Sequence, residues 1–198
     1  MKEILTNVLN NSYSYQDYRK TVTDLLQEGK SSGAIQSEAL VNYSRLNETR
    51  MYRLDKTLVI DQTIVSKLKT IQSQYIWLVI SEGWCGDAAQ ILPIFNKMDK
   101  VSAKIEMKIV FRDENEELMN LFLTNGTKSI PKLIILDKNT LNVIADWGPR
   151  PKGAIDLVQN YKDKFGVIDD TTKAELQMWY LRDKGLSTQK EIMELMPS

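Results

Sequence analysis

The chain has 198 residues, of which 42% are hydrophobic and 26% charged, a composition typical of a soluble globular protein with one large domain or one domain with additions. Basic and acidic residues both number 26, which gives no indication of a nucleic-acid partner, and no apolar stretch approaches the roughly 18 residues of a membrane-spanning helix. The absence of histidine and the single cysteine, Cys85, exclude histidine-dependent catalytic triads and an internal disulfide, and we expect no metal and no cofactor.

The amino-terminal part of the chain is predicted to be helical. Its first residues lack the basic and apolar regions of a signal peptide, and the single cysteine favours a reducing compartment, so we expect a cytoplasmic protein. Apolar residues recur at helical spacing over residues 15–26, Gly29 ends that segment, and a second segment begins near Ser37. Residues 1–56 are therefore expected to form a helical extension packed on the rest of the protein.

Residues 57–165 are predicted to form an α/β domain with a mixed sheet. The run Tyr75–Ile80 is too continuously apolar to have a solvated face, which predicts a central strand covered on both sides. Asp61 and Asp113 are each expected to cap the helix that follows, and Pro93 is expected to bend the helix that contains it. The predicted strands are 57–60, 75–80, 105–111, 133–136 and 142–147, and the helices between and after them give the order βαβαβαββα, with the last two strands forming a hairpin.

Residues 166–198 are predicted to add a helical carboxy-terminal extension. One helical pattern runs over residues 171–183. In a second pattern, Thr188 and Glu191 have the spacing of a capping box ahead of an apolar segment, so we expect a helix to begin there.

Two short motifs give the chain a family resemblance. Trp84-Cys85-Gly86-Asp87-Ala88 follows an apolar strand directly, and Ile130-Pro131 precedes a later strand about 45 residues on. Together with the order of elements, these motifs resemble the thioredoxin superfamily over residues 57–165. The resemblance implies a thioredoxin-like three-layer fold with a mixed central sheet, in which the Ile-Pro pair has a cis peptide bond and faces the thiol. Gly148 also lies where thioredoxins have a glycine after the last strand.

The resemblance implies a site built around one nucleophilic thiol. The implied catalytic residue is Cys85, and the implied active-turn and substrate-facing residues are Trp84, Gly86, Asp87, Ala88, Ile130 and Pro131.

The position of Cys85 is suited to thiol chemistry. The unpaired amides and dipole at a helix amino terminus stabilise a thiolate, whereas a neighbouring carboxylate on Asp87 would hold the pKa of the thiol up. The glycine-rich turn after Trp84 favours an exposed and reactive thiol over the alternative, a buried and inert cysteine. Arg150 could bind an anion such as a glutathione carboxylate, although an ordinary surface role is favoured. Asp87 as a plain first-turn carboxylate and Pro131 as a routine turn proline are the corresponding alternatives.

Three departures from the family pattern limit the expected activity, one of which is that the helical extensions at residues 1–56 and 166–198 are not part of a minimal thioredoxin. Ala88 stands where the family has its second, resolving cysteine, either as the native residue or as a replacement, so a two-cysteine cycle cannot run within one molecule. The buried acid that many thioredoxins carry in the preceding strand maps to Val79, which cannot accept a proton.

The expected function is thiol–disulfide exchange through Cys85 alone. A mixed disulfide on this residue would be released by an external thiol, and the expected partners are protein thiols or disulfides, or a low-molecular-weight thiol, with no nucleic acid and no membrane. The alternatives are a non-catalytic thioredoxin-like adaptor that binds proteins through Trp84, Pro131 and the added helices, and a redox sensor in which Cys85 becomes a sulfenic acid.

Overall fold

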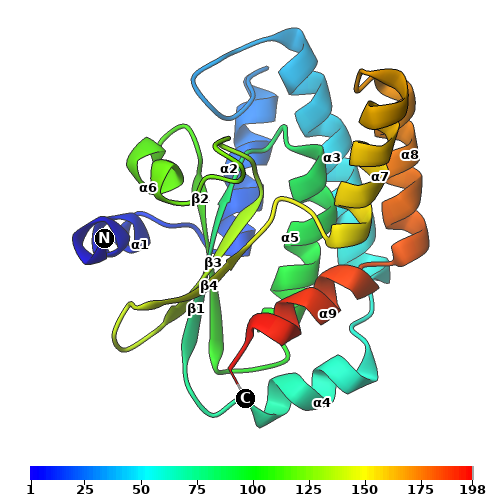
Figure 1. Ribbon diagram of the computed structural model, residues 1–198. Coiled ribbons are helices and arrows are strands. Elements are labelled where there is room, and N and C mark those ends of the chain that lie inside the picture. Colours follow the sequence, from blue (N-terminus) through cyan, green and yellow to red (C-terminus); the bar gives the residue numbers. More distant parts are fainter. Residues whose placement is uncertain (198) are drawn as a thin grey trace.

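The computed structural model describes residues 1–197 and contains a four-stranded mixed sheet with helices on both faces (Figure 1). In Figure 1, α3, α5, α7 and α8 lie on one side of the sheet, and α1 and α6 lie on the other. The helices are α1 (Lys2–Asn10), α2 (Tyr15–Gln27), α3 (Glu38–Thr57), α4 (Gln62–Thr70), α5 (Gly86–Asp99), α6 (Glu116–Leu121), α7 (Lys152–Phe165), α8 (Asp170–Asp183) and α9 (Leu186–Leu195). The strands are β1 (Tyr75–Ser81), β2 (Ile105–Phe111), β3 (Lys132–Asp137) and β4 (Val143–Trp147). The predicted α/β fold with helical extensions is thus confirmed.

The sheet has the strand order β2-β1-β3-β4. β1 pairs in parallel with β2 and antiparallel with β3, and every residue of β1 is buried, so the prediction of a central strand covered on both sides is confirmed. β3 and β4 form the predicted antiparallel hairpin. This order places the carboxyl end of β1, from which the chain runs into α5, in the middle of the sheet.

The predicted strand at 57–60 is wrong. The helix α3 continues to Thr57, and the next residues belong to no strand. Leu58 and Ile60 are buried while Val59 is 72% exposed, so the segment has the alternating pattern of a strand without pairing with one. The outer edge of β2 is instead met by Tyr13, whose amide and carbonyl both bond to Ile109 at 2.8 and 2.9 Å.

Of the two predicted aspartate caps, one is confirmed. Asp61 accepts a hydrogen bond from the amide of Thr63, 2.8 Å away, at the start of α4. Asp113 does not cap α6, which begins only at Glu116, because its carboxylate accepts bonds from Arg112 and from the amide of Ala34 instead.

The predicted capping box before the last helix is also wrong. α9 begins at Leu186, directly after Gly185, so Thr188 lies within the helix, and its side chain is buried in the protein. The Glu191 carboxylate reaches out of α9 and accepts bonds from the indole of Trp147 and the amide of Lys152, both at 2.8 Å. Glu191 thereby ties α9 to β4 and to the start of α7.

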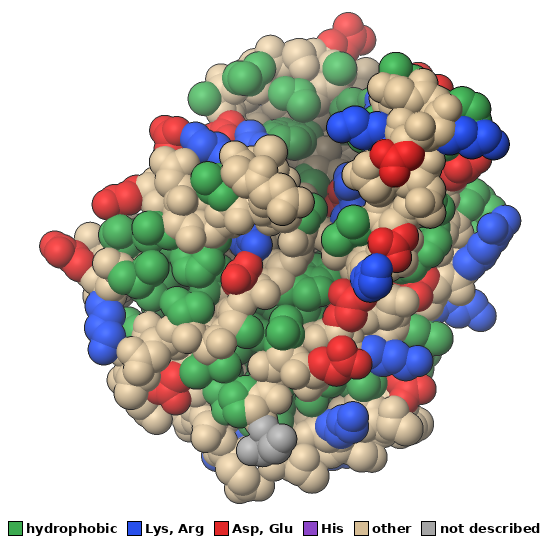
Figure 2. All heavy atoms as spheres, viewed as in Figure 1, with side chains coloured by type: hydrophobic (Ala, Val, Ile, Leu, Met, Phe, Trp, Pro, Cys, Tyr) green, Lys and Arg blue, Asp and Glu red, His purple; other side chains and the backbone are tan. Residues whose placement is uncertain are grey.

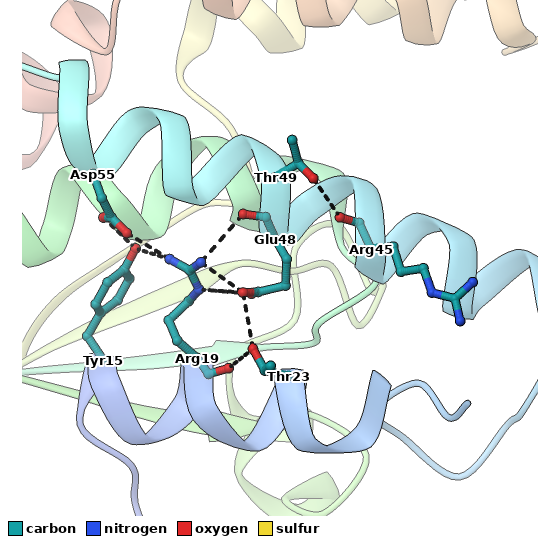
Figure 3. A network of polar contacts seen from close by, with 7 residues as sticks. All are labelled: Tyr15, Arg19, Thr23, Arg45, Glu48, Thr49 and Asp55. Carbon is teal, nitrogen blue, oxygen red and sulfur yellow. Dashed lines mark hydrogen bonds and ion pairs between the residues drawn. The ribbon is translucent and has the colours of Figure 1, made fainter. Parts of the chain in front are cut away.

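The amino-terminal helices are joined by a polar network around Arg19 (Figure 3). The guanidinium of Arg19 on α2 lies 2.8 Å from Glu48 and 2.7 Å from Asp55, both on α3. The hydroxyl of Tyr15 donates a bond of 2.8 Å to Asp55. These contacts fix α2 against α3, which in turn packs on α5.

One continuous hydrophobic core joins the extensions to the sheet. Leu5 of α1, Val22 of α2 and Ile192 of α9 belong to the same buried cluster as Trp77 of β1. Within residues 1–197, no helix is both long and apolar enough to cross a membrane.

Candidate functional site

Cys85 stands at the amino terminus of α5. Its backbone is extended and it forms the N-cap, and its Sγ accepts a long bond from the amide of Ala88 at 3.5 Å. The thiol therefore faces the positive end of the helix, as the sequence predicts. The predicted exposure is wrong: only 7% of Cys85 is accessible, because the loop carrying Ile130 lies directly against the sulfur.

The loop before β3 lies against the thiol of Cys85. The thiol of Cys85 donates to the carbonyl of Ile130 at 3.3 Å, and the Ile130–Pro131 peptide bond is cis. Gly148, with φ of 123°, lies behind this loop, and a Cβ at this position would come within 2.2 Å of the Pro131 carbonyl oxygen. Only glycine allows this approach, so β4 can end tightly against the loop.

A buried ionic cluster surrounds the next residue of the turn. The carboxylate of Asp87 is almost fully buried and accepts from Arg150 at 2.8 and 2.7 Å through Nε and Nη2. The hydroxyl of Tyr180 donates to the other carboxylate oxygen at 2.9 Å. Arg150 is thus neither an ordinary surface residue nor a free anion-binding group, since its guanidinium neutralises Asp87.

Tyr180 is a site residue that the sequence analysis missed. It lies on α8, 93 residues from its partner Asp87, and its burial raises its pKa so that it remains a neutral donor. In the sequence, a tyrosine at helical spacing has the appearance of an ordinary core residue, and no local motif marks it.

The surroundings of Cys85 raise its pKa to about 12. Burial is the largest cause, and the charge of Asp87 adds to it. The amides of Ala88 and Asp87 and the charge of Arg150 act in the opposite direction. The thiol is therefore protonated at neutral pH.

The remaining residues of the turn have different surroundings. Trp84 is half-buried, with the guanidinium of Arg112 4.9 Å from its ring centre. A side chain on Gly86 would lie 3.7 Å from Arg50 of α3 and 3.9 Å from Gln177 of α8. Ala88 faces the core. The molecular surface is hollowed beside α7, and hydrophobic side chains lie in this hollow (Figure 2).

A second buried acid, Glu82, stabilises the start of the turn through hydrogen bonds. It follows β1 directly, and it accepts bonds from the hydroxyl of Ser32 and from the amide of Asp113, the latter at 3.0 Å. Ser32 also accepts from the amide of Gly83 at 2.8 Å, and Asn47 of α3 donates to the Gly83 carbonyl at 3.0 Å. Burial raises the pKa of Glu82. Glu82 was not among the predicted site residues, although its place between an apolar strand and a glycine turn is visible in the sequence.

Comparison with protein families gives one match. The family model described as Thioredoxin matches residues 33–162, which include the whole sheet, the Cys85 turn and the Ile130–Pro131 loop. No curated protein matches the chain.

Solved structures resemble most of the chain. A protein of unknown function from Pseudomonas aeruginosa is 15% identical with a TM-score of 0.56, over 92% of this chain and 96% of that one. An HIV epitope-scaffold is 16% identical with the same TM-score of 0.56, over 92% of this chain and 97% of that one. At these identities the likeness concerns the fold, which is shared well beyond the residues that the family model matches.

Proposed function

The chain belongs to the thioredoxin family, and on that premise we propose that it is a thiol–disulfide oxidoreductase that works through Cys85 alone. The observation that carries the proposal is the placement of the Cys85 sulfur. It lies at the amino terminus of α5 within reach of the Ala88 amide, and it donates a hydrogen bond to the Ile130 carbonyl. An extended chain bound beside Pro131 would meet the thiol there.

The proposed reaction has two exchange steps. The Cys85 thiolate attacks one sulfur of a disulfide, so that a bond from Cys85 to that sulfur forms and the second sulfur leaves as a thiolate with the electron pair. An external thiolate then attacks the bound sulfur, the new disulfide departs, and Cys85 leaves as a thiolate that is reprotonated. The second step needs an external thiol because the sequence contains no other cysteine.

Asp87 and Arg150 would set the reactivity of the thiol. At rest, the high pKa of Cys85 keeps the sulfur protonated. Since Arg150 opposes the effect of Asp87 on the thiol, a substrate that changes their pairing would change the fraction of thiolate. Protein disulfides and low-molecular-weight disulfides are the proposed substrates, and the external thiol that completes the cycle suits the reducing cytoplasm.

Intact-mass measurement after incubation with oxidised glutathione tests the proposal. We expect one glutathione adduct, absent from Cys85→Ser and removed by reduced glutathione. Because the pKa of Cys85 is about 12, labelling should accelerate about tenfold for each pH unit between 8 and 10 without a plateau. Native protein that stays unlabelled at pH 10, while the unfolded chain is labelled, would refute the oxidoreductase.

One observation favours a second candidate, a thioredoxin-like adaptor without turnover. Cys85 is buried and its pKa is raised, as expected of a cysteine whose role is packing. In that case the Trp84 and Pro131 surface binds proteins and Cys85→Ser binds them equally well. A third candidate, the redox sensor, predicts one added oxygen on Cys85 after peroxide treatment, detected by the same mass measurement.

A further inference from the structure

A cavity of about 570 Å³ lies farther along α5, apart from the thiol. It is enclosed by the end of α3, the middle of α5 and the junction of α8 with α9, which lie together on the same side of the sheet (Figure 1). Tyr180 forms the wall between this cavity and Asp87. The volume is within the range of small-molecule sites, about 300–1,000 Å³.

The cavity walls are largely apolar. Ile94 of α5 is buried at the floor, while Val59, Leu181 and Leu186 line the cavity with 72%, 50% and 39% of their surfaces accessible. Large apolar side chains that stay exposed around a concave site gain free energy when a ligand with an apolar body covers them. The walls thus favour a ligand that carries a hydrocarbon segment.

Positive charge is in excess at the cavity. Arg53 and Lys184 both line it, and neither forms an ion pair with another residue of the described range 1–197. The one lining carboxylate, Asp61, is engaged as the cap of α4. Burial is the largest cause of the lowered pKa of Arg50, one turn earlier on α3, and the charge of Arg53 acts in the same direction. The cavity therefore suits an anionic group.

The end of α8 places Lys184 at the cavity. Lys184 has a left-handed conformation with φ of 55°, and Gly185 follows with φ of 78°. A Cβ on Gly185 would lie 2.7 Å from the Ile94 side chain, so the α8–α9 junction is pressed against the cavity floor. The left-handed conformation of Lys184 ends α8, whose last turn is closed by the bond from the Lys184 amide to the Tyr180 carbonyl at 3.1 Å.

We propose that this cavity binds a small amphipathic carboxylate. The hydrocarbon segment lies against Ile94, Leu181 and Leu186, and the carboxylate lies between Arg53 and Lys184. The combination of an apolar floor with two unpaired cations distinguishes this ligand from a neutral alcohol and from an amine of equal length. The proposal is independent of any thiol chemistry at Cys85.

Calorimetric titration of the full chain with octanoate, 1-octanol and octylammonium tests the charge preference. We expect octanoate to bind at one site, 1-octanol to bind about tenfold more weakly and octylammonium not to bind, since a charge-assisted hydrogen bond contributes about a factor of ten or more. The double variant Arg53→Gln/Lys184→Gln should lose about tenfold in octanoate affinity. Equal affinity for octanoate and 1-octanol, or no octanoate binding at all, overturns the proposal.

A matched control separates the cavity from general surface charge. Arg45→Gln/Lys173→Gln removes one cation from each of α3 and α8 at exposed positions outside the cavity, and we expect it to bind octanoate like the parent protein. Leu181→Gln alters only the apolar wall and should lower the affinity for octanoate severalfold. In the parent protein, we expect the chemical-shift changes on octanoate binding to be concentrated at the Ile94 methyl groups. Equal loss in the control pair, or shifts away from Ile94, overturns the proposal, and unchanged circular dichroism of each variant shows that the fold is intact.

Discussion

Opposing effects determine the pKa of the Cys85 thiol. The helix amides of Asp87 and Ala88 favour the thiolate, while burial and the Asp87 carboxylate favour the thiol, and the second group prevails with a pKa of about 12. In the resting protein the carboxylate is held on both oxygens, by Arg150 and by Tyr180. The charge at position 87 is therefore a fixed part of the site.

The substitution Asp87→Asn tests this electrostatic effect. Removal of the carboxylate charge should lower the pKa of Cys85 by about one, which gives about ten times more thiolate at pH 8. Because a less basic thiolate is also a weaker nucleophile, the rate of iodoacetamide alkylation should rise by only about threefold. The measurement is the alkylation rate between pH 7 and 10.

Tyr180→Phe is the matched control for this experiment. It removes one hydrogen bond to Asp87 but leaves the carboxylate charged and paired with Arg150, so its alkylation rate should stay closer to that of the parent. A rate in Asp87→Asn equal to that of the parent would show that burial alone sets the pKa of Cys85.

Local motifs made part of this site predictable. The turn around Cys85 and the Ile130–Pro131 pair are each contiguous in sequence, so pattern and resemblance together indicate where they lie. The contact of Tyr180 with Asp87 depends on how α8 docks, which no local pattern encodes. The burial of Cys85 likewise arises from a loop 45 residues away.

At the scale of single elements, α3 is important because it positions residues of the turn before Cys85. Its start was predictable because Ser37 caps it through a bond to the amide of Leu40. Its end was not, since Leu58 and Ile60 alternate with an exposed Val59 and imitate a strand. Its position matters because it packs along α5 and carries Asn47, which donates a hydrogen bond to the carbonyl of Gly83 in the turn before Cys85.

The substitution Arg19→Ala tests how firmly α2 holds α3. It would leave the carboxylates of Glu48 and Asp55 partly buried without their cation, which should lower the free energy of unfolding by about 2 kcal/mol, between the values for exposed and buried pairs. Urea denaturation followed by circular dichroism is the measurement. Lys20→Ala, which breaks an exposed pair on the same helix, should change stability by less than about 0.5 kcal/mol. Similar losses in the two variants would contradict the role of the network.

At the scale of the whole molecule, the terminal helices are parts of one packed body. The sequence predicted a helix near the carboxyl end from its apolar spacing, but spacing cannot show that Ile192 inserts into the same core as Trp77 of β1. The docking is fixed by long-range contacts, such as Glu191 with Trp147 and Gln189 with the amide of Asp61. We infer that the Cys85 turn and the carboxy-terminal helices unfold together.

The substitution Ile192→Ala tests this cooperativity. Ile192 is fully buried, so truncation should lower the free energy of unfolding by about 3 kcal/mol, whereas Ile155→Ala at a 44% exposed position of α7 should cost less than about 1 kcal/mol. Unfolding returns the pKa of Cys85 from about 12 toward 9.0, so alkylation of Cys85 is a sensitive probe of the unfolded population.

If the molecule unfolds as one unit, the Ile192→Ala variant should populate its unfolded form about 100-fold more than the parent, and Cys85 alkylation at pH 8 in the absence of urea should rise accordingly. Tryptophan fluorescence and Cys85 alkylation should then give the same urea midpoint, because Trp77 and Trp147 of the sheet and the thiol lose their surroundings in a single step. If α9 were a separately unfolding unit, the substitution would leave Cys85 as protected as in the parent. The two probes would then follow different transitions, and α9 would unfold separately from the rest of the core.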